Sequence, residues 1–129
     1  MILAIDPGKI KCGLAVLNES GNVLEKKIIP RLEILSDLPF YLSRFSIATV
    51  IVGQGAFGKE LGKELVELDL KINIVFVSEK NSTLEARKLY WLNHKPLGLY
   101  RFLPASLRVP PVPIDDYAAM ILGSRYLEG

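Results

Sequence analysis

The sequence has very few of the residues that carry sulfur or imidazole chemistry. Among its 129 residues there is one cysteine, Cys12, and one histidine, His94. A single cysteine excludes an internal disulfide and leaves no second thiolate for a zinc site, so we expect Cys12 to be a small buried hydrophobe. His94 follows an expected helix, and we interpret it as a C-terminal cap rather than a base. Neither a Ser-His-Asp arrangement nor a cysteine nucleophile with its base is expected.

Long hydrophobic runs are also missing, although 50% of the residues are hydrophobic. The longest apolar stretches have the length of a strand. The N-terminus lacks the basic region, the long apolar segment and the small-residue cleavage site of a signal peptide. We therefore expect a cytoplasmic protein without membrane contact. The length and the apolar content predict a single domain over residues 1–129 with a real core.

Five segments have the pattern of strands. Three of them, residues 1–6, 12–17 and 23–29, are separated by turn signals and are expected to form an antiparallel meander. The β-branched run at 48–52 is typical of a strand buried on both faces, and residues 72–77 form the fifth segment. With helices between the later strands, the expected fold class is α/β. It combines a meander of three strands with two parallel strands in one mixed five-stranded sheet that carries packed helices.

Four segments are expected to be helical. The first has a capped start at Ser36, with Pro39 in its opening turn. The second follows residue 58 and is expected to direct Leu61, Leu65 and Leu68 inward. A capping box from Ser82 to Glu85 predicts a helix to about residue 93, on which the leucines at 89 and 92 pack inward. A proline-punctuated segment then precedes a final helix, expected over residues 115 to about 127.

Acidic residues stand at the ends of several of these segments. Asp6 ends the first strand, Glu79 follows the fifth, and Asp115 with Asp116 begins the last helix. Such ends can converge on one spot, because sites in sheets of this kind lie at the carboxyl ends of the strands. Carboxylates held close together are costly unless a cation neutralises them. The pattern predicts a magnesium site, although turn formation and helix capping also account for individual residues.

Three motifs resemble those of one family. Residues 2–8 (ILAIDPG) with Gly13 resemble the first motif of the RuvC and YqgF nucleases of the RNase H-like superfamily. Residues 78–87 (SEKNSTLEAR) are similar to the YqgF pattern of acidic residue, basic residue, Ser/Thr, small apolar residue, Glu, Ala and Arg. Residues 114–122 (IDDYAAMIL) with Tyr126 resemble the closing helix of that family. The three matches bracket nearly the whole chain in the family's order.

The resemblance implies a fold, a reaction and roles for the acidic residues. The fold would be RNase H-like. Asp6, Glu79 and Asp115 would be the catalytic carboxylates, and together with Asp116 they would bind Mg²⁺, with Mn²⁺ as the alternative ion. The implied activity is hydrolysis of phosphodiester bonds, either in processing the 5′ end of pre-16S rRNA or in resolving Holliday junctions. A homodimer would suit the second substrate.

Two alternatives to a nuclease remain open from the residues. Gly53, Gly55 and Gly58 follow a strand and open a helix, and Glu79 comes about twenty residues later, which matches the dinucleotide-binding fingerprint locally. The second alternative is a catalytically silent nucleic-acid-binding module, because Ser78 stands where the family usually has Asp, and the loop after the fourth strand is short.

Positive charge is concentrated in one stretch. The formal net charge is only +2, but residues 80–108 carry +5 and leave −3 for the remainder. Basic groups mixed with aromatic side chains suit a surface that neutralises phosphates and stacks unpaired bases, although a solvated helix face would have the same composition. The candidate substrate-binding residues are Lys80, Arg87, Arg101 and Arg108 in this stretch and Lys9 and Lys11 near Asp6, with the aromatic residues Tyr90, Trp91, Tyr100 and Phe102 beside them. The expected partner is RNA or branched DNA.

Overall fold

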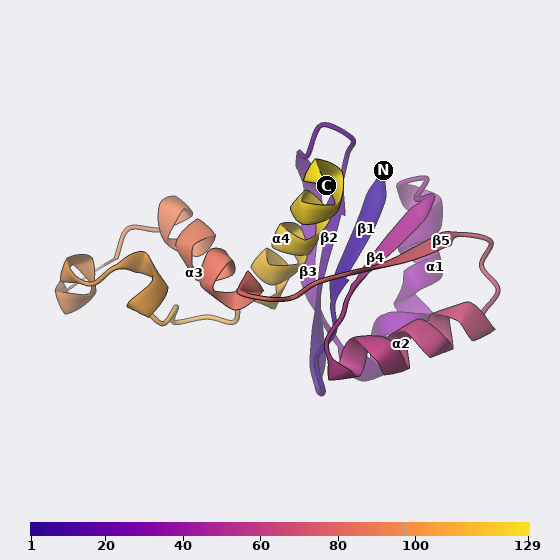
Figure 1. Ribbon diagram of the computed structural model, residues 1–129, viewed down its shortest axis with the longest axis horizontal. Coiled ribbons are helices and arrows are strands. Elements are labelled where there is room, and N and C mark those ends of the chain that lie inside the picture. The colour runs from indigo at the N-terminus through magenta and orange to yellow at the C-terminus, as the bar shows by residue number, and fades with distance from the viewer. Residues whose placement is uncertain (97) are drawn as a thin grey trace.

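The centre of the molecule is a mixed five-stranded sheet in the order β3-β2-β1-β4-β5 (Figure 1). The computed structural model describes residues 1–96 and 98–129, with the backbone alone at 99, 100 and 106. Strand β1 pairs antiparallel with β2 and parallel with β4; β2 and β3 are antiparallel, and β4 and β5 are parallel. The predicted α/β class and strand directions are confirmed. The strands are β1 (Ile2–Asp6), β2 (Lys11–Leu17), β3 (Val23–Pro30), β4 (Thr49–Gly53) and β5 (Asn73–Val77).

Local hydrogen bonds explain the tight turn of the meander. The side-chain Oδ1 of Asn18 accepts the backbone N–H groups of Ser20 at 3.0 Å and Asn22 at 2.9 Å. Gly21 has a φ of +86°, a conformation that glycine adopts without steric cost. Strand β3 ends at Pro30, as predicted, because proline has no N–H group to continue the ladder.

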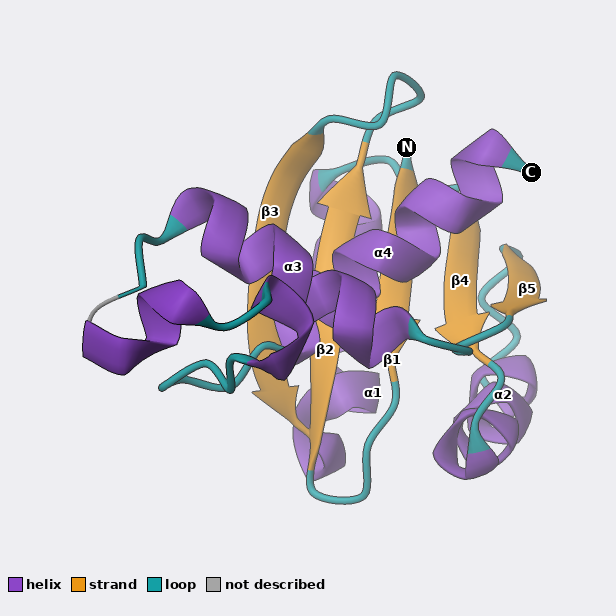
Figure 2. Cartoon of the chain, turned by 60° about the vertical axis from the view of Figure 1, so that its left-hand side comes forward, coloured by secondary structure: helices purple, strands orange, loops and turns teal. Residues whose placement is uncertain are grey.

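The two faces of the sheet bury different side chains under different helices. Leu3 and Ile5 point to the face that helices α1 (Ile34–Arg44) and α2 (Ala56–Glu67) cover. Ala4 and Ala15 point to the other face, which α4 (Asp115–Glu128) crosses (Figure 2). Helix α3 (Ser82–Asn93) packs on α4 farther from the sheet. The small side chains on the α4 face let that helix approach the strands closely.

The first helix begins earlier than the sequence predicts. A 3-10 turn over Arg31–Glu33 leads directly into α1, so Ser36 is not its N-cap and Pro39 lies inside the helix. Proline costs the helix one backbone hydrogen bond at this point. Ile34 is fully buried, and this burial explains why the helix extends upstream of the sequence signal.

Two further helix predictions are corrected. In α2, Leu61 and Leu65 are buried as predicted, but Leu68 lies beyond the helix and is 42% exposed. In α3 the capping box does not form: Asn81, in a left-handed conformation with φ of +62°, is the N-cap, and no side chain caps the helix. The Glu85 carboxylate turns to Arg125 on α4 instead, at 3.1 Å.

Helix α3 also departs from its predicted packing. Leu92 is 81% exposed, although it was expected inside, whereas Tyr90 is buried against Tyr117 and Leu89 packs beside them. His94 places its Nδ1 2.9 Å from the carbonyl oxygen of Tyr90, which confirms the predicted C-terminal cap.

The chain between α3 and α4 extends away from the sheet (Figure 1). It contains 3-10 turns at Gly98–Phe102 and Ala105–Leu107. Several of its described apolar side chains are exposed, with Phe102 the most exposed at 72%. Within the described parts of the chain, no helix combines the length and apolar character needed to cross a membrane.

Candidate functional site

Asp6 lies at the carboxyl end of the central strand of the sheet. It pairs in register with Gly13 of β2, on the same face as Ala4 and beneath the start of α4. Neighbouring strands on both sides limit its access to water, and the residue is only partly exposed. The central position of β1 therefore places a carboxyl group where its charge is poorly solvated.

Glu79 reaches the same end of the sheet from the loop after β5. Its carboxylate lies against two glycines that end β4 and begin α2. A Cβ atom added to Gly53 would overlap Glu79 Oε1, and one added to Gly55 would overlap Glu79 Oε2. Any other residue at either position would have to displace the carboxylate or its loop. The glycines thus form a cradle for Glu79, which we call the glycine cradle (Gly53 and Gly55).

The same two glycines suggested a dinucleotide fingerprint in the sequence. In the structure, the space next to them is filled by the Glu79 carboxylate. Gly58 completes the pattern in a different way: a Cβ atom there would overlap the carbonyl oxygen of Gly53, so it allows α2 to pack tightly against the end of β4. Packing within the chain accounts for all three glycines.

Asp115 is brought to the site by the first turn of α4. A Cβ atom on Gly13 would overlap the Asp115 carbonyl group and lie 2.9 Å from the backbone nitrogen of Asp116. The missing side chain at Gly13 therefore lets the N-terminus of α4 contact β2 directly beside Asp6. The positive end of the helix dipole also favours carboxylates at this position.

The three carboxyl groups interact electrostatically. The pKa of Asp6 is raised from 3.8 to about 7, first by burial, then by a hydrogen bond to Glu79, and then by the negative charges of Glu79 and Asp115. A hydrogen bond between two carboxyl groups requires a proton on one of them. Asp6 therefore keeps a proton, through which it hydrogen-bonds to Glu79, up to a higher pH than an ordinary Asp side chain does when no cation is present.

The donor chemistry of the site suits a hard divalent cation. Glu79 Oε1 is buried without a hydrogen-bond partner, whereas the buried Asp115 Oδ2 has the Lys11 ammonium group as its ion-pair partner. Magnesium prefers carboxylate oxygens. Nevertheless, in residues 1–96 and 98–129 no group of three or more His, Cys, Asp or Glu side chains is arranged to hold a metal ion. Of the predicted ligands, Asp6 and Glu79 thus contact each other, while Asp115 lies close to them but is paired with Lys11.

Two lysines account for the direction of the helix carboxylates. Lys11 Nζ lies 3.3 Å from Asp115 Oδ2, and Lys26 Nζ lies 3.0 Å from Asp116 Oδ2. Asp116 also accepts the backbone N–H of Tyr117 at 3.0 Å, and Lys26 sits over the Tyr117 ring. Asp116 is thus paired with β3, and no interaction between it and Asp6 contributes to the Asp6 pKa. Lys11, predicted to bind phosphate, contacts Asp115 instead.

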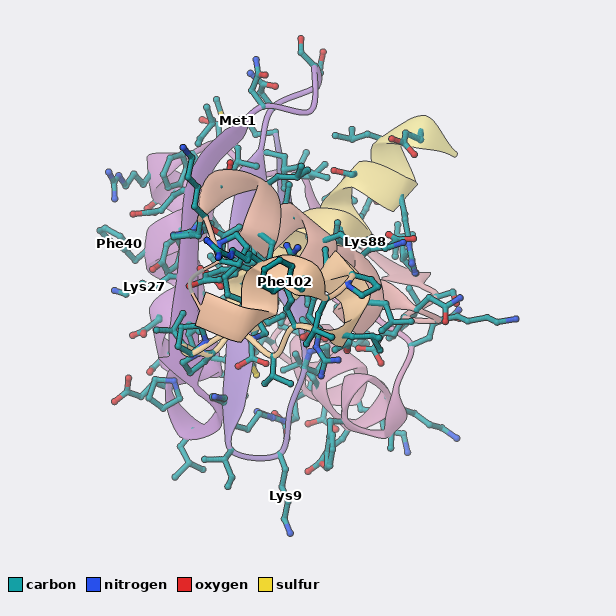
Figure 3. The ribbon with its side chains drawn as sticks, turned by 90° about the vertical axis from the view of Figure 1, so that its left-hand side faces the viewer. Met1, Lys9, Lys27, Phe40, Lys88 and Phe102 are labelled. Carbon is teal, nitrogen blue, oxygen red and sulfur yellow. The ribbon has the colours of Figure 1, made fainter. Side chains whose placement is uncertain are left out.

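The predicted basic residues occupy several places around the site. Lys80 is exposed directly after Glu79, and Lys9 extends away from the body of the molecule (Figure 3). Arg101 lies over the Phe102 ring, with 4.9 Å between the guanidinium carbon and the ring centroid. Arg108 donates a long hydrogen bond of 3.4 Å to the Arg101 carbonyl, and Arg87 on α3 is half-buried.

The aromatic residues of the basic stretch divide into buried and exposed ones. Tyr90 is buried, and Trp91 donates its ring N–H to the carbonyl of Arg108 at 3.0 Å. Phe102 is exposed on the extended segment (Figure 3). The side chain of Tyr100 lies outside the described residues. Of the aromatic side chains described in this stretch, Phe102 is the most exposed.

Three functional features were missed in the sequence. The sequence shows the glycine cradle only as a local match to the dinucleotide-binding fingerprint, an alternative to the nuclease, and Gly13 only as part of a motif. Arg125 was not noted at all, although it donates to the carbonyl oxygens of Ser78 and Lys80 at 2.7 Å each. No local pattern in the sequence reveals this contact, because Arg125 is more than forty residues away from Ser78 and from Lys80.

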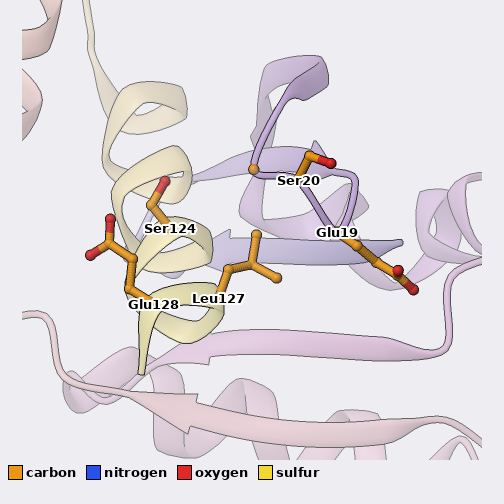
Figure 4. A pocket seen from close by; sticks show the side chains of 6 residues that line it. Glu19, Ser20, Ser124, Leu127 and Glu128 are labelled. Carbon is orange, nitrogen blue, oxygen red and sulfur yellow. The ribbon is translucent and has the colours of Figure 1, made fainter.

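Two surface hollows among the described residues are lined by none of Asp6, Glu79 and Asp115. One lies at the opposite end of the sheet, between the β2–β3 hairpin and the end of α4 (Figure 4). It is lined by Glu19, Ser20, Gly21, Ser124, Leu127 and Glu128. A shallower one borders the glycine cradle and is lined by Gln54, Gly55, Lys59 and Phe76.

Comparisons with known proteins support the fold. No family model and no curated protein matches the sequence. Among solved structures, Thermus thermophilus RuvC is similar with a TM-score of 0.58 and 17% identity, over 99% of this chain and 96% of that one. The fold is therefore RNase H-like, as in RuvC.

Two kinases are similar over a smaller part of this chain, with lower scores. A candidate sugar kinase from Cytophaga hutchinsonii has a TM-score of 0.49 and 11% identity, over 70% of this chain and 39% of its own. A candidate N-acetylmannosamine kinase from Listeria monocytogenes has a TM-score of 0.44 and 19% identity, over 67% of this chain and 38% of its own. This chain thus spans well under half of either kinase.

Proposed function

We propose that this chain is a magnesium-dependent nuclease that hydrolyses phosphodiester bonds in structured nucleic acid. The observation that carries the proposal is the hydrogen bond between Asp6 of β1 and Glu79 of the β5–α3 loop, with the charge of Asp115 on α4 acting on Asp6, at one end of an RNase H-like sheet. Burial first, and then the hydrogen bond to Glu79 and the negative charges of Glu79 and Asp115, raise the pKa of Asp6 to about 7. Carboxylates gathered in this way are typical of a site that is completed by a cation.

The chain's own residues would prepare such a site in a defined order. Asp6 and Glu79 would bind Mg²⁺ or Mn²⁺, and Asp6 would release its proton. Asp115 would join them when Lys11 turns from its carboxylate to a phosphate of the substrate. The divalent ion would supply activation of water and stabilisation of the leaving oxygen. Asp116 would remain with Lys26 and support the first turn of α4 rather than bind the ion.

The substrate would be bound along a path of basic residues. Lys80, beside Glu79, would contact the phosphates closest to the site, and Arg101 and Arg108 would contact phosphates along the extended segment. Phe102 would stack on an unpaired base next to them. Trimming of an rRNA precursor and resolution of a four-way junction are both consistent with this arrangement. The junction would require a twofold dimer, since it presents two symmetric cuts.

A nucleic-acid-binding module without catalysis is the second candidate. It is favoured by one observation: in the described residues, Asp115 is paired with Lys11 and three metal ligands do not converge. If that ion pair persists when nucleic acid binds, the site would hold no ion firmly. Both candidates would bind nucleic acid, but only the nuclease would cleave it.

The decisive experiment is Asp6→Asn, assayed on labelled precursor rRNA and branched DNA with and without magnesium. We expect cleavage to fall at least about a hundredfold, because the Asn amide binds a divalent ion weakly, while nucleic-acid affinity changes less than about twofold. Glu19→Gln, at the opposite end of the sheet, is the matched control and should cleave like the wild type. Equal cleavage by Asp6→Asn and the wild type would exclude the proposed site. A wild type that binds but never cleaves would favour the silent module.

A further inference from the structure

We infer that Arg125 is a positioning residue for Glu79, and that it acts by fixing the backbone of the loop that carries this carboxylate. The inference deepens the proposed function, because it concerns the same site. Arg125 lies in the C-terminal half of α4, two helical turns or more beyond Asp115. One helix would thus present a candidate ligand at its first turn and hold a second one in place farther along.

The guanidinium group of Arg125 forms hydrogen bonds to the loop on both sides of Glu79. Its Nη1 donates to the carbonyl oxygen of Ser78 and its Nη2 to that of Lys80, both at 2.7 Å. Distances this short are typical of charge-assisted hydrogen bonds. The planar, fork-shaped group fixes two carbonyls at once, and therefore the direction in which the intervening side chain leaves the backbone.

The rest of the loop is consistent with a fixed conformation. The carbonyl oxygen of Glu79 accepts the N–H of Ser82 at 2.9 Å, and the N–H of Lys80 is 3.2 Å from Ser78 Oγ. Asn81 closes the turn with a φ of +62°, a left-handed conformation that asparagine adopts more readily than most residues with a side chain. Together with Arg125, these contacts engage three consecutive carbonyl groups, at Ser78, Glu79 and Lys80.

A fixed loop is needed because Glu79 faces Asp6, and the two carboxylates repel each other once Asp6 is ionised. The carboxylate is held against the glycine cradle and close to Asp6, and Glu79 Oε1 has no hydrogen-bond partner. Strand β5, which leads into the loop, is at the edge of the sheet and has a neighbour on one side only. A loop without an anchor could relieve the repulsion by turning Glu79 outward to water. Arg125 opposes that movement from the α4 side.

Arg125 is itself held in place by Glu85. The ion pair between Arg125 Nη2 and Glu85 Oε1, at 3.1 Å, connects α3 to the same guanidinium group. The Glu85 side chain is 47% exposed and the Arg125 side chain 24% exposed. We therefore expect the two carbonyl contacts to matter more than the ion pair, because exposed pairs contribute little.

The first test measures the loop itself and is independent of catalysis. Amide hydrogen exchange is compared between the wild type, Arg125→Ala and Arg44→Ala, the last being a control for loss of a surface arginine on α1, which pairs with Glu25. We expect Arg125→Ala to speed exchange over residues 79–82 at least about tenfold and to leave β1 and β4 unchanged. Unchanged exchange in the loop would overturn the inference, and so would a uniform increase across the sheet.

The second test asks whether Arg125 acts through Glu79. Manganese binding, followed by electron paramagnetic resonance, and magnesium-dependent cleavage are measured in a cycle of Arg125→Ala, Glu79→Gln and the double variant. We expect Arg125→Ala to weaken manganese binding and lower kcat about tenfold or more, with KM for nucleic acid within about twofold, and to add nothing in the Glu79→Gln background. Arg125→Lys should recover part of the effect, and Glu85→Gln should have the smallest effect.

The outcomes separate this inference from the proposed function. Additive effects in the cycle would overturn the positioning role, since a residue that only stabilised the fold would act independently of Glu79. A wild type without cleavage or manganese binding would overturn the proposed function. In that case the exchange experiment would still decide whether Arg125 fixes the loop.

Discussion

Acidic side chains lie at both ends of the sheet, and their surroundings differ completely. At the end with Asp6, the carboxylates come from three elements, Asp6 is poorly solvated, and Glu79 Oε1 is buried without a hydrogen-bond partner. At the other end, Glu19 and Glu128 line a hollow beside the hairpin, and both are exposed (Figure 4). Water solvates the second group freely, so nothing there requires a cation.

The comparison shows that burial, and not the number of acidic residues, distinguishes a candidate site. The fold builds the Asp6 end with three glycines, at 13, 53 and 55, each of which leaves room for a neighbouring carboxyl-bearing residue. No such arrangement surrounds Glu19, where Gly21 serves the turn and has open space around it. The following experiments test whether this difference is real.

The largest expected effect is on the pH dependence of stability. The pKa of Asp6 rises from 3.8 to about 7 on folding, so the native state binds its proton more tightly than the unfolded chain does. Stability should therefore fall as the pH rises from about 4 through 7, by no more than about 4 kcal/mol for this group. Asp6→Asn should remove this contribution and be more stable than the wild type above pH 7. Urea unfolding in the presence of a chelator measures both curves.

The control for that experiment is at the opposite end of the sheet. Glu128→Gln should follow the wild-type pH curve, because its carboxylate is exposed. Parallel curves for Asp6→Asn and the wild type would contradict the electrostatic difference between the two ends.

The second effect concerns the glycine cradle. Gly55 has φ of −74° and ψ of −178°, which alanine can adopt, so Gly55→Ala adds a methyl group without backbone strain. Because that group would overlap Glu79 Oε2, we expect a loss of about 1 to 3 kcal/mol in the free energy of unfolding. The Glu79→Ala background should recover most of the loss. An equal loss in both backgrounds would show that Glu79 does not occupy the cradle.

The smallest effect concerns the lysine next to the site. Lys11→Gln removes the cation that pairs with Asp115 and leaves the carboxylates more negative, so magnesium should bind more tightly, by about fivefold or less for an exposed pair. Magnesium-dependent shifts in the melting temperature would measure this. Lys27→Gln, on the exposed face of β3, is the control and should bind like the wild type. Weaker binding by Lys11→Gln would mean that Lys11 does not compete with the ion.

Most of the sheet could be predicted from the sequence because its signals are local. Pro30, the hairpin turn around Gly21 and the β-branched run at 49–52 each act within a few residues, and the structure confirms all three. The start of α1 was wrong because the burial of Ile34 outweighed the capping signal at Ser36. The capping box in α3 was wrong because Glu85 found a partner on α4.

The site was only partly predictable. Strand ends placed Asp6 and Glu79 correctly near each other, since the carboxyl ends of β1, β4 and β5 share one edge. The pairing of Lys11 with Asp115 and of Lys26 with Asp116 depends on the distance between α4 and the meander, which no pattern in the sequence gives. The role of the glycine cradle could not be predicted either, because the same sequence pattern of glycines makes room for a bound phosphate or for a carboxylate of the chain.

The close contact at Gly13 has an evolutionary consequence. The backbone of Asp115 occupies the volume of a side chain at position 13, so even an alanine there would have to move the terminal helix. The meander and that helix are about a hundred residues apart in sequence. The residue at position 13 and the position of the helix N-terminus therefore cannot change independently during evolution. A lineage that acquired a larger residue at position 13 would have to re-place its third carboxylate at the same time, which makes this position a marker for whether a distant homologue retains the same site.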